Sequence, residues 1–278
     1  MIRSSQHHPL VSLAATALLA LVCALTMVCT NAHAANEDGS PTATATAEDE
    51  LPPPLQRLRE ARLAELRAEL SALDVGGGEK VTKDRAVMLY HIAELSNDFT
   101  AAGDVVDLFE TLIARDPGDA QLRVYLGAAY TLRARDFPLQ GVFMVLPGPG
   151  YVRLYHLGKG VQILNDALAA NGNDPMARLI RGVTFSDMPR LFGRHEEGLA
   201  DLELLREWVD NPKANPQYEA LLTDRAFRGD ALVRLAVALW AGQQMERSRE
   251  MFLRTAAQAP AASPTALAAK EMAERLAR

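Results

Sequence analysis

Apolar side chains recur every three to four residues along most of this chain, which is the spacing that places them on one face of an α-helix. The pattern predicts helices over 84–95, 101–115 and 120–135, with an Asp-Pro-Gly-Asp turn at 116–119. No stretch alternates apolar and polar residues with a period of two, and Ala and Leu are abundant, so the predicted fold class is all-α. Further helices are expected to begin near Tyr151, Pro175, His195, Gln217, Arg228, Met245 and Ser263.

Residues 1–34 have the pattern of a secretory signal peptide. Arg3 precedes an almost uncharged apolar stretch from Leu10 to Thr30, and the Ala-His-Ala of 32–34 fits a signal-peptidase site. We therefore expect cleavage after Ala34 and a periplasmic location. The apolar stretch is nearly long enough to span a bilayer, so an inner-membrane anchor formed by an uncleaved signal is the alternative.

Both cysteines of the chain, Cys23 and Cys29, lie inside the predicted signal. A mature chain that starts at Ala35 therefore has no thiol for a disulfide or for a cysteine metal site. Loss of Arg3 with the signal leaves 28 basic against 35 acidic residues, a formal net charge of −7. This acidic balance argues against nucleic acid as a partner.

A spacer and a leading helix are predicted to come after the signal. Residues 35–53 are acidic and rich in small residues and proline, and are expected to be a disordered spacer. The range 54–75 is expected to form an amphipathic helix that ends at the three glycines of 76–78. This helix could cap the row of later helices or pair with a partner helix. Its apolar stripe consists of Leu63, Leu66, Leu70 and Leu73.

Three stretches of the chain resemble tetratricopeptide repeats. The segment from Leu122 to Tyr130, with Leu126 and Gly127 inside it, has the leucine, small residue and tyrosine of that family's first helix. In such hairpins small residues let the two helices approach closely, and proline ends the second helix. Matching residues are Leu89, Ile92, Ala93, Phe109 and Pro117 in an earlier unit, and Leu232, Leu235, Ala236, Leu239, Ser248, Phe252, Thr255 and Pro260 in a later one.

The resemblance covers about Arg85 to Pro260 and implies a TPR-like, right-handed solenoid of antiparallel helix hairpins over 82–278. An insertion at about 136–151 interrupts the pattern, which leaves roughly three to five repeats. The function that the resemblance implies is a non-catalytic scaffold that binds a partner protein or peptide on its concave face. The alternative is a soluble ligand-binding subunit of an envelope transport system, similar to helical-repeat components of periplasmic solute transporters.

The insertion carries the first group of candidate contact residues. The stretch 137–151 is rich in large apolar side chains and closes with Pro-Gly-Pro-Gly before Tyr151. These side chains either fold back into the core or form a lid or an exposed contact for a partner, lipid or small ligand. The candidate residues are Phe143, Met144 and Tyr151.

The predicted turn over 187–195 carries the second group, because Phe192 lies between two arginines there. Arginine beside an aromatic ring suits the capture of a carboxylate or phosphate. With two arginines of the preceding helix, four guanidinium groups could converge on an acidic ligand. Salt bridges within the protein are the alternative use of these side chains. The four arginines are Arg178, Arg181, Arg190 and Arg194.

No catalytic or metal constellation is expected. The predicted mature chain holds only His91, His156 and His195, and no two of them have the spacing of metal ligands. No glycine-rich phosphate loop follows a strand. The sequence therefore predicts no enzyme activity, no cofactor and no metal. Membrane contact is expected only if the signal stays uncleaved or if the 137–151 loop inserts, and the oligomeric state stays open.

Overall fold

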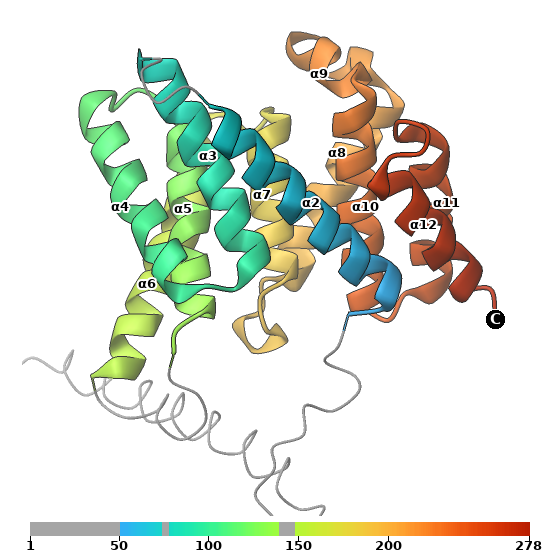
Figure 1. The fold of residues 1–278 in the computed structure, drawn as a ribbon, viewed down its shortest axis with the longest axis horizontal. Coiled ribbons are helices and arrows are strands. Elements are labelled where there is room, and N and C mark those ends of the chain that lie inside the picture. Colours follow the sequence, from blue (N-terminus) through green and yellow to red (C-terminus); the bar gives the residue numbers. More distant parts are fainter. Residues whose placement is uncertain (1–50, 74–77, 139–147) are drawn as a thin grey trace, which may run out of the picture.

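The computed structural model describes residues 51–73, 78–138 and 148–278, and every regular element in these ranges is helical (Figure 1). The predicted all-α class is confirmed for this part of the chain. The predicted signal, nearly all of the predicted spacer, and Phe143 and Met144 lie outside the described residues. Within the described ranges, no helix combines the length and the apolar composition that a membrane crossing requires.

Most helices begin close to the predicted positions, but α3 begins at Gly78, six residues before the predicted start at Asp84. The later helices, α6 to α12, start within about three residues of the expected starts, and α5 covers its predicted range. The elements are α2 (Pro53–Ala72), α3 (Gly78–Ser96), α4 (Phe99–Arg115), α5 (Ala120–Arg135), α6 (Pro149–Ala170), α7 (Pro175–Ser186), η2 (Arg190–Phe192), α8 (His195–Asp210), η3 (Pro212–Ala214), η4 (Pro216–Tyr218), α9 (Glu219–Thr223), α10 (Arg225–Ala241), α11 (Met245–Gln258) and α12 (Pro264–Arg275).

Aspartate side chains set the starts of four of these helices. Each accepts hydrogen bonds from backbone N–H groups of the first turn, which have no partner inside the helix. The negative charge also favours the N-terminal end of the helix dipole. The caps are Asp98 for α4, Asp119 for α5, Asp174 for α7 and Asp224 for α10.

The helices pack mainly as pairs of chain neighbours: α3 with α4, α5 with α6, α7 with α8, and α10 with α11. The first helices of successive pairs also contact one another, α3 with α5, α5 with α7, and α7 with α10. Helix α12 packs on α11 at the far end of this row. We call the side formed by α3, α5, α7 and α10 the first-helix face.

Glycines let the backbones of two helix pairs touch. A Cβ atom added to Gly160 of α6 would lie 2.6 Å from the carbonyl oxygen of Gly127 on α5. A Cβ atom on Gly198 of α8 would lie 2.7 Å from the carbonyl oxygen of Gly182 on α7. Real Cβ atoms do not come this close to an oxygen, so only glycine fits at these crossings. The pairs are thereby held at a fixed, short separation.

Helix α2 contacts α3 at one end of the row and α12 at the other, and it runs diagonally across the row (Figure 1). Of the predicted leucine stripe, Leu66 is buried, whereas Leu63 and Leu70 are only half-buried. The deepest leucine is Leu55, which lies outside the predicted stripe and packs in the core formed with α10 and α12. The leading helix therefore joins the two ends of the fold.

Gly160→Ala should lower the free energy of unfolding by about 2 kcal/mol, because overpacking a tight contact typically costs that much. The new methyl group would lie 2.6 Å from the Cγ2 atom of Thr131 as well as from Gly127. Gly158→Ala in the same helix is the matched control, since no heavy atom lies within 4 Å of its added Cβ. It should leave stability unchanged or raise it by up to about 1 kcal/mol. Urea denaturation followed by circular dichroism measures both, and equal stabilities would contradict the close crossing.

Candidate functional site

Charged side chains gather where the C-terminal ends of α3, α5 and α7 meet α10. Glu94 comes from α3, Arg135 ends α5, Asp187 directly follows α7, and Arg234 lies on α10. The Nη1 atom of Arg234 donates to Oε1 of Glu94 at 2.9 Å, and Nη2 of Arg135 donates to the backbone oxygen of Glu94 at 3.2 Å. Each helix of the first-helix face thus contributes one charged residue. We call these four residues the polar centre.

Glu94 is the anchored acid of the polar centre. Its side chain is only 11% exposed, and burial alone would raise its pKa. The charge of Arg234 and the hydrogen bond with His91, 3.0 Å away, outweigh burial and hold the pKa of Glu94 at about 2. Glu94 in turn raises the pKa of Arg234. This ion pair therefore stays charged across the physiological range and ties α3 to α10.

Asp187 is the acid of the polar centre that is left unpaired. Its side chain reaches solvent, and among the described residues no hydrogen bond or ion pair engages its carboxylate. The surrounding helices nevertheless remove enough water to raise its pKa to about 6. The charge of Glu94 raises this pKa further, whereas Arg234 and Arg135 oppose the shift without reaching bonding distance. Asp187 is therefore an accessible acceptor whose charge the protein only partly compensates.

Aromatic rings border the polar centre on the side of α3. The ring of Tyr90 lies 5.0 Å from that of His91 and 5.1 Å from that of Tyr125, both in edge-on geometry. Tyr90 is buried, and burial together with the nearby charge of Glu94 raises its pKa well above the usual value. The hydroxyl therefore stays protonated and available as a hydrogen-bond donor.

Two of the four predicted arginines bind a separate buried carboxylate, that of Asp201. Arg178 donates from Nη1 to Oδ1 of Asp201 at 2.5 Å, and Arg181 donates from Nε to Oδ2 at 2.6 Å. The side chain of Asp201 is 2% exposed, so this network lies inside the protein between α7 and α8. For Arg178 and Arg181, the structure shows the salt-bridge alternative.

The other predicted residues of this turn lie at the surface. Arg190 is exposed on η2, and Phe192 at the end of η2 is half-buried. Arg194 donates from Nη1 to Oε1 of Glu197 at 2.6 Å. Gly193 has a φ of 65°, the left-handed conformation expected for a turn residue. The structure therefore brings Arg178 and Arg181 together on one carboxylate and engages Arg194 with a different one.

Tyr151 begins an exposed apolar patch at the start of α6. It is 53% exposed, and its neighbours Val152 and Tyr155 are 46% and 59% exposed. The two other candidates of the insertion, Phe143 and Met144, lie outside the described residues.

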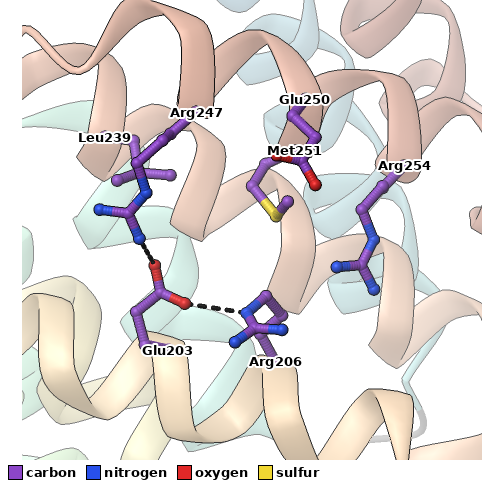
Figure 2. A pocket seen from close by; sticks show the side chains of 7 residues that line it. All are labelled: Glu203, Arg206, Leu239, Arg247, Glu250, Met251 and Arg254. Atoms are coloured by element: carbon purple, nitrogen blue, oxygen red, sulfur yellow. Dashed lines mark hydrogen bonds and ion pairs between the residues drawn. The ribbon is translucent and has the colours of Figure 1, made fainter.

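A pocket of about 140 Å³, which we call the outer pocket, lies mainly between α8 and α11, with Leu239 of α10 also in its lining (Figure 2). Its arginines are already paired: Glu203 lies between Arg206 and Arg247, as Figure 2 shows, and Arg254 bonds to Asp210. The pocket is therefore an ion-paired surface rather than a free anion site. Its lining residues are Glu203, Arg206, Leu239, Arg247, Glu250, Met251 and Arg254.

Metal-ligating side chains do not converge anywhere in 51–73, 78–138 or 148–278: no three His, Cys, Asp or Glu residues come together there. The polar centre is the group that sequence reasoning missed. One signal could have indicated it, since Glu94 interrupts the apolar run formed with Ile92, Ala93 and Leu95. A charge at such a position requires a buried partner from another helix.

In comparisons with known proteins, no family model, no curated protein and no solved structure matches this chain. The function therefore has to be argued from the geometry of the chain itself.

Asp187→Asn should change the pH dependence of stability. Because folding raises the pKa of Asp187 from 3.8 to about 6, the folded chain binds a proton more tightly than the unfolded chain between those values. Stability of the wild type should thus rise as the pH falls from about 7 to about 4. At pH 7 the variant should be more stable by up to about 1 kcal/mol, a figure reduced because solvent screens the exposed side chain. Denaturation curves at pH 4 and pH 7 measure the effect, and a variant that tracks the wild type at both would contradict it.

Glu94→Gln should destabilise the protein at pH 7, whereas Asp187→Asn should stabilise it. At pH 7 the Glu94→Gln change should lower the free energy of unfolding by about 3 kcal/mol, because it removes the nearer of the two carboxylates that pair with Arg234, the other being Asp230 at 3.7 Å. The lowered pKa of Glu94 means that the wild type loses this contribution as the pH falls from 4.5 to about 2, so the two proteins should converge there. Glu246→Gln, at an exposed position of α11, is the control and should change stability by less than about 0.5 kcal/mol. A Glu94 variant as stable as this control would refute the anchoring role.

Proposed function

We propose that this protein is a non-catalytic, TPR-like scaffold of the periplasm that binds a partner protein or peptide on its first-helix face. The packing of the helices supports this proposal, because helix pairs whose first helices contact one another in succession are the arrangement expected of a helical-repeat solenoid. In such a solenoid the first helices line the concave surface. The location rests on the signal pattern of residues 1–34.

The single observation that carries the proposal is the unpaired carboxylate of Asp187. It lies on the first-helix face among charges that are otherwise paired, and it reaches solvent. The surrounding helices nevertheless remove enough water to raise its pKa to about 6. A donor from a partner, such as a lysine, arginine or backbone N–H group, would form a hydrogen bond with the carboxylate of Asp187. This bond would offset the free-energy cost of keeping a charge at that position. The outer pocket offers no free arginine for an anionic ligand, because acidic side chains already engage Arg206, Arg247 and Arg254.

The transport-subunit alternative required a cavity lined by Arg190 and Arg194. Arg194 is instead engaged by Glu197, and Arg190 is exposed on η2. The positions of Arg190 and Arg194 therefore give the transport-subunit alternative no specific support, and we propose the scaffold function.

Affinity capture from cell-envelope extract tests the proposal, with the tagged full chain as bait and mass spectrometry of the retained proteins and small molecules. Asp187→Asn should reduce retention of a stoichiometric partner at least about 10-fold, the usual effect of weakening a hydrogen bond to a charged group. Glu250→Gln is the matched control, since it makes the same change on the outer pocket. It should leave retention unchanged.

Two outcomes would contradict the scaffold. Equal retention of the partner by the wild type and by both variants would remove the binding role of the first-helix face. A retained small molecule without any protein would favour the transport subunit instead.

A further inference from the structure

The first two turns of α6 project from the body of the protein, beyond the ends of α4 and α5 (Figure 1). Nε of Arg153 donates to the backbone oxygen of Ala134, one residue before the end of α5, and so holds α6 to α5 at that level. The side chains on either side of Arg153 are apolar and between 39% and 59% exposed. They are Tyr151, Val152, Leu154 and Tyr155, which we call the projecting end.

The apolar surface of the projecting end is continuous. At 100° per residue its four side chains spread over about half of the helix circumference, which is the side that faces away from α5. Single exposed apolar residues are common on protein surfaces, whereas a contiguous exposed apolar group marks an interaction site. The projecting end is therefore a candidate contact for an apolar environment outside the protein.

Positive charge follows the projecting end along α6. Tyr151, Tyr155 and Lys159 are spaced four residues apart and lie on one stripe of the helix, and Nζ of Lys159 is 6.0 Å from the centre of the Tyr155 ring. The range 149–165 contains no aspartate or glutamate, although the whole chain has a net charge of −6. This helix surface thus differs in sign from the chain as a whole.

Arg133 of α5 adds a charge that the protein leaves without a partner. In the part of the chain that the structure describes, its guanidinium group forms no hydrogen bond or ion pair, and its Nε atom is buried. Glu110 feels the charge of Arg133, but its carboxylate bonds to Lys159, 3.1 Å away, and to the hydroxyl group of Tyr130. Two cations therefore share one acid here.

His156 shows that these cations act beside the projecting end. Its ring stacks on that of Tyr130 at 5.6 Å and lies one residue after Tyr155. Burial, followed by the charges of Arg133 and Lys159, lowers the pKa of His156 below its ordinary value of 6.5. The projecting end is thus backed by an excess of positive charge between α5 and α6.

We propose that the projecting end of α6 inserts into the surface of an anionic lipid bilayer, with its apolar side chains at the acyl boundary and with Arg133 and Lys159 facing the lipid headgroups. A bilayer offers an apolar layer and, outside it, a negatively charged surface in this order. Lys159 lies about 12 Å further along the helix than Tyr151, which suits an apolar end buried by about 5–10 Å. Tyrosine is also typical of the membrane interface.

This bilayer contact goes beyond the scaffold function and is compatible with it. Helix α6 is the second helix of its pair and lies outside the first-helix face. Insertion of the projecting end would hold the scaffold at a membrane and leave the polar centre accessible to a partner.

Depth-dependent quenching of a fluorescent probe tests the insertion in the full chain. Cys23→Ser and Cys29→Ser remove the two native thiols, and Tyr151→Cys then carries a nitrobenzoxadiazole probe. In vesicles of phosphatidylglycerol and phosphatidylcholine, spin-labelled acyl chains should quench this probe. The matched control is the same probe on Leu267→Cys, since Leu267 is 54% exposed on α12, and it should not be quenched. Residues 1–34 are the same in both chains, so the comparison reports on α6.

Two substitutions test the separate contributions of charge and apolar surface. Arg133→Gln should lower the ratio of quenched to unquenched probe about 5-fold, the contribution of one basic residue near an anionic surface, and high salt should remove the difference. Lys270→Gln, at an exposed position of α12, is its control. Tyr155→Ser should lower the ratio by a similar factor through lost apolar area, whereas Leu267→Ser should leave it unchanged.

Equal quenching of the probes at 151 and 267, or none at 151, would overturn the proposal, provided that circular dichroism shows the helices intact. Quenching of the same size in pure phosphatidylcholine would refute the role of the cations. A response of the probe at 151 to soluble glycerol phosphate, without one to vesicles, would assign Arg133 to a free phosphate ester and refute the bilayer. No cellular protein enters these measurements, so their failure is distinct from failure of the Asp187 capture experiment.

Discussion

Contact between the backbones of paired helices is the constraint on which the rest of this structure depends. Gly127 with Gly160, and Gly182 with Gly198, bring α5 to α6 and α7 to α8 at distances that exclude any side chain. In the α10–α11 pair the residues are Ala236 and Ser248, whose hydroxyl group donates to the Ala236 carbonyl oxygen at 2.8 Å. Because each pair is narrow, the first helices of neighbouring pairs can touch, and the C-terminal ends of α3, α5 and α7 come together beside α10.

Two carboxylates in that small region show how placement decides chemistry. Glu94 has Arg234 and His91 as partners and is ionised down to a pKa of about 2. Asp187 feels the same arginines without bonding to them, and its pKa rises to about 6. A perturbed acid in contact with solvent is typical of a site kept for a ligand, whereas buried structural acids are usually satisfied from within, as Asp201 is by Arg178 and Arg181.

The sequence predicted the local features well because local rules determine them. Most helix starts follow from the three-to-four spacing of apolar side chains. The structure adds the aspartate caps, and it places Gly127, Ala236 and Ser248 at close helix crossings. The polar centre could not be predicted, because Glu94 and Arg234 are 140 positions apart and meet only through the stacking of several helix pairs. For the same reason Leu55 was missed as an anchor: the helix that buries it, α12, lies at the opposite end of the chain.

Hydrogen–deuterium exchange of the full chain, alone and with the partner it captures, tests whether the first-helix face is the binding surface, because it locates that surface without a substitution. Binding on the first-helix face predicts slower exchange at the end of α3, in residues 187–192 and on α10. Protection confined to α8 and α11, around the outer pocket, with no change near Asp187, would contradict this assignment.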